Sequence, residues 1–187
     1  MNKTYNYQLP QLPERTVKPR EKGMTMVMDK GLSLRQAEDF LSMTDQYVDI
    51  IKLGFGTSIV SPNLKEKIAL YKEAGIPVYF GGTLFEAFLV RDRLDDYLKY
   101  LDKYDIQHVE VSDGSIEISQ DEKCEYITRL SKNYTVLSEV GSKDSGIIVS
   151  PAKWIKWMSN ELEAGSWKVI AEGRESGNVG VFRPNGS

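Results

Sequence analysis

The feature that most constrains this chain is a unit that repeats from residue 24 onward: a short apolar run, a polar turn with glycine, and an amphipathic helix. Each apolar run is rich in Val, Ile, Tyr or Phe, which is typical of buried parallel strands. We therefore predict six strands, at residues 24–28, 48–53, 77–80, 108–111, 135–140 and 168–171. Because strands alternate with helices, they are expected to form one parallel sheet.

Capping signals mark where the intervening helices begin. S/T-x-x-E/Q patterns predict capping boxes, and they begin at Ser33, Thr83 and Ser119. Ser61 and Ser150 each precede a proline, which predicts a capping hydroxyl followed by a first-turn proline. Gly75 precedes the run at 77–80 and predicts the end of the second helix.

Two architectures fit this alternation: an open doubly wound sheet and a closed (βα)8 barrel. Ionisable residues lie on or at the ends of the apolar runs, at Lys52, Glu110, Glu139 and Glu172. A central strand covered by helices on both faces has no favourable place for a charge. The upper interior of a barrel does, because it opens into a polar site. A doubly wound sheet gathers its ligand-binding residues at one switch point, whereas here polar clusters follow every apolar run. We therefore expect an α/β fold of the TIM (βα)8 barrel family.

The length of the chain is short for such a barrel. Prolines 10, 13 and 19 among charged residues predict an extended arm over residues 1–22, followed by the barrel domain over residues 23–187. The runs recur about every 29 residues, so eight units need roughly 230 residues, close to a typical barrel. About six units are present, and we expect the C-terminal units to be missing, either by truncation or because a partner chain closes the barrel.

Composition excludes several classes of protein. Lys plus Arg is 24 and Asp plus Glu is 27, so the net charge of −3 argues against a nucleic-acid partner or a basic membrane anchor. One cysteine forbids an intramolecular disulfide and a Cys-based zinc site. No signal peptide or membrane-spanning run is evident. The sequence therefore predicts a cytoplasmic protein with no membrane contact.

Charged residues at the strand ends are the candidate chemistry. The carboxylates are Glu110, Asp113, Glu139 and Glu172, and the cations are Lys52, Lys143 and Arg174. Carboxylate oxygens bind Mg²⁺, whereas Lys and Arg bind phosphate, sulfonate or carboxylate groups. The mixture predicts an anionic substrate with a divalent metal. The alternative is that the charges only pair with each other, which seldom repays their desolvation.

Glycine-rich turns add weaker signals. Gly81 and Gly82 join a strand to a helix, where backbone N–H groups could bind an anion, although tight packing explains them equally well. The segment 172–180 holds three glycines after a strand and favours phosphate or metal binding over a plain surface loop. His108 lies where its strand begins and Cys124 lies inside a helix, so we expect both to be structural.

A series of motifs resembles the phosphosulfolactate synthase family. In order they are DKG at 29–31, KLGFGT at 52–57, GGTLFE at 81–86, EVSDGS at 110–115, EVGSK at 139–143, EGRESG at 172–177 and FRPNG at 182–186. Lys18-Pro19-Arg20 fits as well, and the resemblance covers essentially the whole chain. It implies a (βα)8 lyase that adds sulfite to phosphoenolpyruvate with Mg²⁺, giving (2R)-phospho-3-sulfolactate. Such enzymes serve coenzyme M synthesis in methanogens, and relatives occur in sulfolactate-forming bacteria and in plants.

The resemblance also assigns roles at the site. Lys143 is the expected general acid, although some relatives carry a second Lys where Ser142 stands. The expected substrate-binding residues are Lys52, Gly82, Thr83, Ser112 and Arg174. Glu110, Glu139 and Glu172 are expected to bind Mg²⁺ or orient the cations, and the last two to take part in catalysis.

Other functions stay open. One is a barrel lyase or aldolase on another phosphorylated acid, with Lys143 or Lys52 forming a Schiff base. Another is a non-catalytic stress or interaction protein that keeps the motifs. Self-association is expected from the family, and the end product of the pathway is left undecided.

Overall fold

The computed structural model describes residues 6–7, 9–141, 149–173, 177 and 180–181. Its strands are β1 (Met26–Asp29), β2 (Ile50–Leu53), β3 (Val78–Phe80), β4 (His108–Ser112), β5 (Thr135–Val140) and β6 (Lys168–Ala171). Its α-helices are α1 (Leu34–Thr44), α2 (Leu64–Glu73), α3 (Gly82–Leu89), α4 (Leu94–Lys103), α5 (Gln120–Leu130) and α6 (Pro151–Glu163), with short 3-10 turns at Asp45–Tyr47 and Thr57–Ile59.

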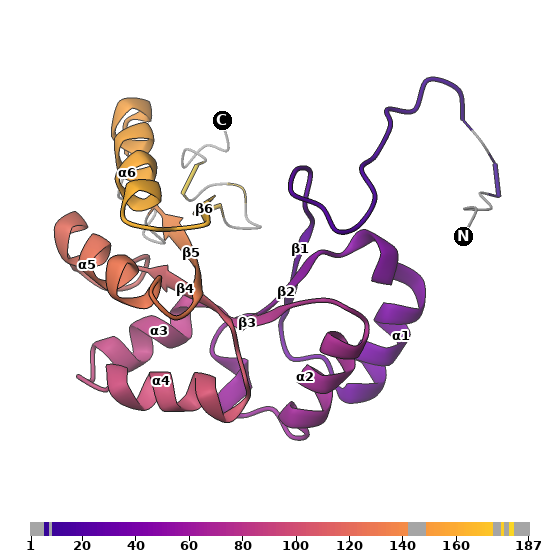
Figure 1. Cartoon of the computed structure of the whole chain (residues 1–187), viewed down its shortest axis with the longest axis horizontal. Helices are drawn as coiled ribbons and strands as arrows, with labels where there is room; N and C mark the ends of the chain where they lie inside the picture. The colour runs from indigo at the N-terminus through magenta and orange to yellow at the C-terminus, as the bar shows by residue number, and fades with distance from the viewer. Residues whose placement is uncertain (1–5, 8, 142–148, 174–176, 178–179, 182–187) are drawn as a thin grey trace.

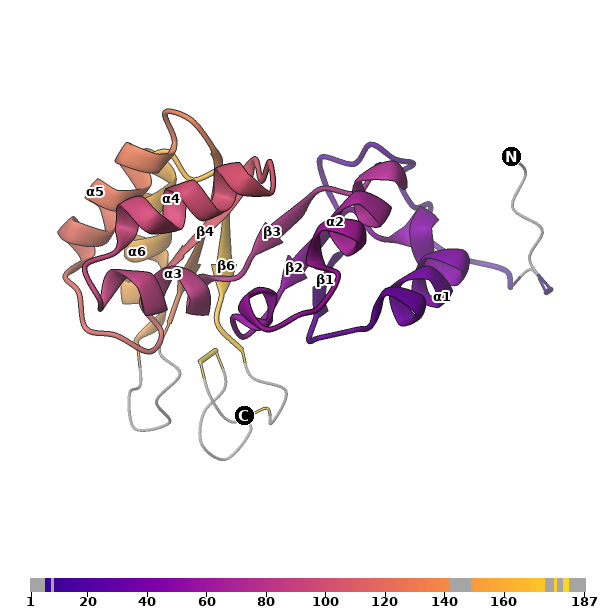
Figure 2. The ribbon, with the colours of Figure 1, turned by 90° about the horizontal axis from the view of Figure 1, so that it is seen from below.

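All six strands lie in one sheet in the order β1-β2-β3-β4-β5-β6, and every neighbouring pair is parallel. The sheet curls, and the helices lie along its outer side (Figure 1). In the view turned by 90°, α1 and α2 accompany the first strands and the later helices accompany β4 to β6 (Figure 2). A doubly wound sheet would reverse its strand order at a switch point. The sequential order confirms the barrel-type α/β fold with six units.

Register determines which side chains share the inner face. Residues paired across parallel strands point to the same side, and successive residues alternate. Lys52 of β2 pairs with Tyr79 of β3, and Ser112 of β4 pairs with Glu139 of β5. Glu110, two residues before Ser112, therefore also points inward. The inner face thus gathers polar residues toward the carboxyl ends of the strands.

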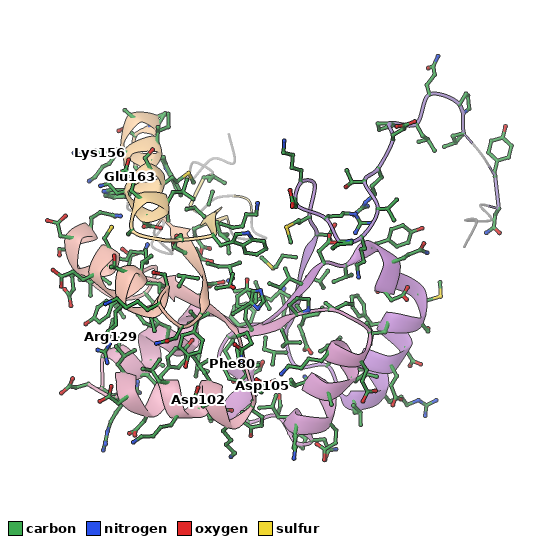
Figure 3. All side chains as sticks on the ribbon, in the orientation of Figure 1. Phe80, Asp102, Asp105, Arg129, Lys156 and Glu163 are labelled. Atoms are coloured by element: carbon green, nitrogen blue, oxygen red, sulfur yellow. The ribbon has the colours of Figure 1, made fainter. Side chains whose placement is uncertain are left out.

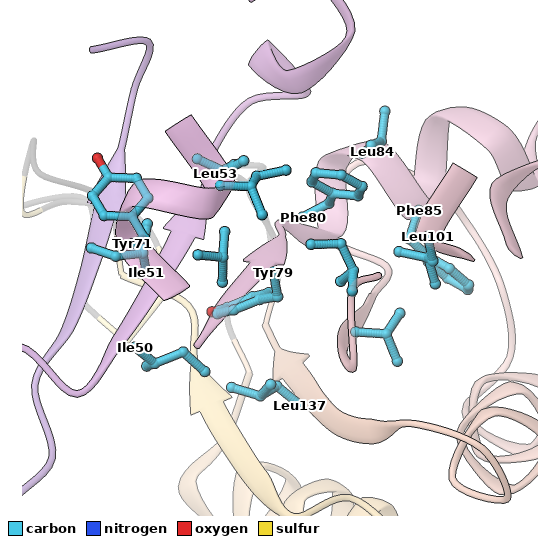
Figure 4. Packing of buried hydrophobic residues seen from close by; sticks show 14 of the residues in the cluster. Ile50, Ile51, Leu53, Tyr71, Tyr79, Phe80, Leu84, Phe85, Leu101 and Leu137 are labelled. Carbon is cyan, nitrogen blue, oxygen red and sulfur yellow. The ribbon is translucent and has the colours of Figure 1, made fainter. Parts of the chain in front are cut away.

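The hydrophobic core fills the layer between the sheet and the outer helices. Leu53 and Phe80 project from the strands toward buried side chains of α3 and α4, including Leu84 and Leu101 (Figure 4). The Phe85 ring meets Tyr97 edge-on, with ring centroids 5.9 Å apart. Apolar burial in this layer stabilises the sheet, while the inner face carries the charged residues.

Several predicted helix boundaries are confirmed. Ser33 forms a complete capping box with Gln36, and the hydroxyl groups of Ser119 and Ser150 accept from backbone N–H groups three residues on. Gly75 follows α2 in the left-handed region, with φ of 69°. These signals act within one turn of chain, which is why the sequence reveals them.

Two predicted helix starts are wrong. The N-cap of α3 is Gly81, Thr83 lies inside the helix, and no side-chain cap is present. The expected partner Glu86 is buried against other residues described below. Helix α2 begins at Leu64 after Asn63, and the Ser61 hydroxyl instead donates to the Thr57 carbonyl. At the start of α3 tertiary contacts of Glu86 outweigh the local capping signal. At Ser61 a competing local hydrogen bond to the preceding turn takes the hydroxyl instead.

The N-terminal arm is anchored at the opposite end of the sheet from the polar cluster. Its described part holds no helix or strand. Arg20 is buried, and its guanidinium donates to the Asp49 carboxylate at 2.8 Å and to the carbonyls of Thr16 and Gln46. Lys168 at the start of β6 donates to the Glu21 carbonyl at 3.2 Å. The arm thus links the starts of β2 and β6. None of the described helices is long and apolar enough to cross a membrane.

Candidate active site

The centre of the inner face is the Lys52 ammonium. Its Nζ lies 2.7 Å from Glu110 Oε1 and 3.1 Å from Glu139 Oε2, so three strands meet at one ion cluster. The side chain of Lys52 is 8% exposed. An ammonium has three N–H donors. Two of them bind these carboxylates, and the third has no partner among the residues that the structure describes.

Electrostatics keep Lys52 protonated. Burial alone would lower the pKa of its amine, but the Glu110 and Glu139 carboxylates outweigh burial and raise the pKa above its usual value. A lysine that acts as a nucleophile needs the opposite shift. The cluster therefore favours the protonated, cationic form of Lys52.

Glu110 is the most enclosed member of the cluster. It is fully buried, and its Oε1 accepts from Lys52 and from the Gly82 N–H at 2.7 Å. Its other oxygen, Oε2, has no hydrogen-bond partner in the described part of the chain. Burial raises the pKa of Glu110, the nearby Lys52 opposes this, and Glu139 adds to it. A buried carboxylate oxygen without a hydrogen bond is unusual, and a proton or an enclosed water would satisfy it.

Tyr79 is a buried neighbour that the sequence did not single out. It pairs in register with Lys52, its side chain is fully buried, and its hydroxyl makes no hydrogen bond to any described residue. Burial, together with the Glu110 carboxylate, raises its pKa. In the sequence Tyr79 lies in an apolar strand and resembles a core residue. Only its register with Lys52 places it beside the ion cluster.

The Gly81-Gly82 turn is required by close approach. A Cβ on Gly81 would lie 2.8 Å from Lys52 Cε, and one on Gly82 would lie 2.1 Å from Ser112 Oγ and 2.7 Å from Glu110 Oε1. The Gly82 N–H, predicted to bind substrate, donates to Glu110. Thr83 is half-buried in the first turn of α3. Packing around the cluster thus explains both glycines.

The remaining predicted residues divide into three groups. Ser112, Glu139 and Glu172 are all buried at the carboxyl ends of β4, β5 and β6. Asp113 turns away from the cluster, because its carboxylate pairs with Lys123 of α5 at 2.7 Å. Lys143 and Arg174, with Ser142 beside the former, lie outside the described residues.

The sequence also missed two buried charges that support the strand ends. Glu86 of α3 accepts from the turn after β4. Lys123 is 1% exposed, pairs with the fully buried Glu161 of α6 at 2.9 Å, and donates to the Glu139 carbonyl at 2.6 Å. Lys123 is one of several charged residues on α5, and Glu86 fits a capping pattern, so only the packed structure reveals what each of them contacts.

The fit of the site to Mg²⁺ is incomplete. Within the described ranges, no group of three His, Cys, Asp or Glu side chains is placed to hold a metal ion. Glu110 and Glu139 each use one oxygen on Lys52. The expected ligand set of Glu110, Glu139 and Glu172 therefore stays a prediction, and no chemical step is derived through a metal.

The chain is similar in sequence to known proteins of one family. Residues 13–187 match the family model for (2R)-phospho-3-sulfolactate synthase. The chain is 38% identical over 178 residues to the phosphosulfolactate synthase of Bacillus subtilis (strain 168), covering 94% of this chain and 71% of that protein. It is 42% identical over 172 residues to the phosphosulfolactate synthase of Methanocaldococcus jannaschii, covering 89% and 68%.

Two solved structures align with most of the chain. The 3-hexulose-6-phosphate synthase from Salmonella typhimurium aligns with a TM-score of 0.45 at 19% identity, over 77% of this chain and 61% of that one. A truncated 3-deoxy-D-arabino-heptulosonate 7-phosphate synthase from Thermotoga maritima aligns with a TM-score of 0.46 at 14% identity, over 89% and 62%. The chain thus spans less than two thirds of either structure.

Proposed function

The chain belongs to the phosphosulfolactate synthase family, and from that premise we propose that it adds sulfite to phosphoenolpyruvate to form (2R)-phospho-3-sulfolactate. Support for the family comes from the match over residues 13–187 and from identities of 36–42% to three relatives of that name. Support from the structure comes from one observation: a protonated lysine held between two carboxylates at the carboxyl ends of a curled parallel sheet.

The reaction makes definite demands on a site. The sulfur lone pair of sulfite forms a bond to the methylene carbon, and the carbon–carbon π electrons move toward the substrate carboxylate. A proton then reaches the carbon that carries the phosphate, so atoms and charge balance. The site must bind two anions and stabilise the charge that develops on the carboxylate. Fixed cations in a water-poor interior do this best.

Lys52 is the described residue that suits this demand. Its two carboxylate partners fix the direction of the ammonium before substrate arrives, and its third N–H, which no described residue accepts, could donate to an anionic oxygen. We assign it to binding the substrate anion and stabilising the developing charge. Arg174 as a second anion-binding residue and Lys143 as general acid stay proposals that rest on the family resemblance.

The rival with a Schiff base on Lys52 is disfavoured by the same geometry, because the raised pKa keeps the amine protonated. Borohydride added with phosphoenolpyruvate tests it. We expect no covalent adduct on Lys52 by mass spectrometry, and a reduced adduct there would favour the aldolase-type alternative.

The function is tested by mixing the purified chain with phosphoenolpyruvate, sulfite and Mg²⁺, and following substrate and product by ³¹P NMR. We expect phosphosulfolactate to form, and Lys52→Met to abolish its formation. Lys99→Met, at an exposed position on α4, is the matched control and should be active. Binding of phosphoenolpyruvate without turnover would favour the non-catalytic alternative.

Mg²⁺ dependence is a separate proposal. Chelation with EDTA followed by readdition of Mg²⁺ should remove and restore turnover, whereas turnover that persists in EDTA would exclude the metal. The cytoplasmic location and the self-association expected from the sequence also stay predictions.

A further inference from the structure

We infer that Glu86 is a positioning residue for the active site: it fixes the turn after β4, and through that turn it sets the carboxylates that hold Lys52. We refer to residues 112–115 as the β4 turn. The inference rests on the proposed function for its kinetic consequences, although the contacts themselves do not.

Glu86 binds the β4 turn through three donors. Its side chain is buried, and Oε1 accepts from the Ser112 hydroxyl and, at 3.1 Å, from the Gly114 N–H. Its Oε2 accepts from the Ser115 N–H at 3.1 Å. A carboxylate satisfies donors on both oxygens, which a neutral amide cannot do. Hydrogen bonds to a charged acceptor are also stronger than neutral ones. The position therefore requires Glu specifically.

Helix α3 contacts the end of β4 at a second point. Gly82 and Glu86 are four residues apart and so lie on one face of the helix. The Gly82 N–H donates to Glu110 Oε1 at 2.7 Å, while Glu86 binds the turn just beyond Ser112. Glu110 and Ser112 alternate on the same inner face of β4. The helix thus fixes both inward-facing residues at the end of the strand.

A second set of contacts links the β4 turn to Glu139, the other carboxylate that binds Lys52. Asp113 lies inside the turn and pairs with Lys123 at 2.7 Å. The same ammonium donates to the Glu139 backbone carbonyl at 2.6 Å. A displaced turn would therefore disturb Glu110 directly and Glu139 through Lys123. Both contacts that orient Lys52 depend on the position of the β4 turn.

The test is Glu86→Gln, which keeps the size of the side chain but places an NH₂ group against backbone donors. A misplacement of about 1 Å costs on the order of 100-fold in rate. We therefore expect kcat to fall about 10- to 100-fold, while KM for phosphoenolpyruvate changes much less. The matched control is Glu163→Gln, on the outer side of the last turn of α6, which should leave both constants unchanged (Figure 3).

Amide hydrogen exchange supplies a readout that needs no turnover. The Gly114 and Ser115 amides should exchange more than about tenfold faster in Glu86→Gln, because each loses a bond to a charged acceptor. Exchange at these amides should not change in Glu163→Gln. If the wild-type chain shows no turnover, the proposed function fails, while the exchange rates still decide whether Glu86 fixes the β4 turn.

Two results would overturn the inference. Unchanged exchange at Gly114 and Ser115 would show that Glu86 does not hold the turn. Faster exchange with unchanged kcat would show that the contact is structural only. If Glu86→Gln does not fold, Glu86→Asp keeps the charge and withdraws it by one methylene. That variant should show a smaller loss of kcat with partial loss of protection, and wild-type values in both would contradict the inference.

Discussion

The ion cluster on the inner face joins the Lys52 ammonium to the two buried carboxylates of Glu110 and Glu139, so each of these three residues depends on the others. Glu110 and Glu139 both contact the Lys52 ammonium, and Glu139 adds to the raised pKa of Glu110. Two carboxylates so close to each other stay ionised together only with a cation between them; without it, one of them takes up a proton. Removing a single partner from a buried ion pair costs far more than the pair itself contributes.

Lys52→Met should accordingly destabilise the fold as well as abolish turnover. We expect a loss of about 3–5 kcal/mol in the free energy of unfolding at pH 8. Without the ammonium, the pKa of Glu110 rises further in the folded state. A carboxyl with a raised folded pKa stabilises the fold below its unfolded pKa and loses that contribution as pH increases. The loss of unfolding free energy caused by Lys52→Met should therefore be smaller at pH 5 than at pH 8, as measured by urea denaturation.

The control for this experiment is Lys99→Met, which removes an exposed lysine and should lower stability by less than about 1 kcal/mol at either pH. An equal deficit for Lys52→Met at pH 5 and pH 8 would contradict the assignment of the cluster.

Asp29 belongs to the DKG motif but has a structural role. Its carboxylate contacts Lys67 at 2.9 Å, the Tyr71 hydroxyl at 3.0 Å, and the N–H groups of Gly31 and Leu32. Burial would raise its pKa, but Lys67 and the backbone donors outweigh burial and lower it. Its partners lie on α2 and on the loop after β1, so the carboxylate organises the loop and not the ion cluster.

Asp29→Asn should therefore cost about 3–5 kcal/mol of stability, because it leaves the buried Lys67 unpaired. A carboxyl with a lowered folded pKa stabilises the fold above its unfolded pKa, near 3.8, and loses this as pH falls through the folded value. The difference in free energy of unfolding between Asp29→Asn and the wild type should therefore become smaller only at acid pH. The exposed Asp39→Asn is the control, and turnover per folded molecule should survive both changes. A stable but inactive Asp29→Asn would instead place Asp29 in the chemistry.

At the scale of elements, helix α3 begins where contact with the ion cluster requires it. Gly82→Ala would bring a Cβ against Ser112 and Glu110. We expect more than tenfold loss of kcat/KM and a cost of about 1–3 kcal/mol from overpacking. Gly75→Ala is the control for glycine replacement. A Cβ at Gly75 would have no atom within 4 Å, so the only cost there comes from the left-handed φ of 69°. It should cost about 1–2 kcal/mol without affecting catalysis. Normal kinetics in Gly82→Ala would show that the cluster tolerates displacement.

This helix also shows which elements the sequence could predict. Ser33 and Ser150 were recognisable as caps because capping is decided within one turn of chain. The start of α3 and the role of Glu86 were not, because both depend on contacts with β4. Helix α4 had no recognisable cap at all, since its N-cap position is Arg93 with no side-chain hydrogen bond. Local signals predict local structure, and long-range contacts override them.

The candidate site follows the same division. Lys52, Glu110 and Glu139 could be predicted because a charge inside an apolar strand conflicts with burial and demands partners. Tyr79 could not, because an aromatic residue in a strand agrees with the core pattern. Asp113 was predicted to join the site because it is a carboxylate after a strand, but it pairs with Lys123 of α5 instead.

At the scale of the whole molecule, the described sheet has two edge strands. β2 to β5 each pair with two neighbours, whereas β1 and β6 each pair with one. The inner strands are almost wholly buried, while every residue of β6 is half-buried or exposed. Backbone groups at an uncovered edge open to water more readily than those in the middle of a sheet.

Native-state hydrogen exchange should therefore rank the strands by their place in the sheet. We expect β3 and β4 amides to exchange only with global unfolding, and β6 amides to exchange much faster through local opening. The measurement is made at two protein concentrations, with the solution mass recorded at each. Fast exchange in β6 at both would show that its edge is open to solvent. Protection of β6 equal to that of β4 would contradict the prediction and show that its edge is covered. If a second copy of the chain covers the edge, protection of β6 should rise with protein concentration, and the solution mass should rise with it. If a segment of the same chain covers the edge, protection of β6 should be the same at both concentrations.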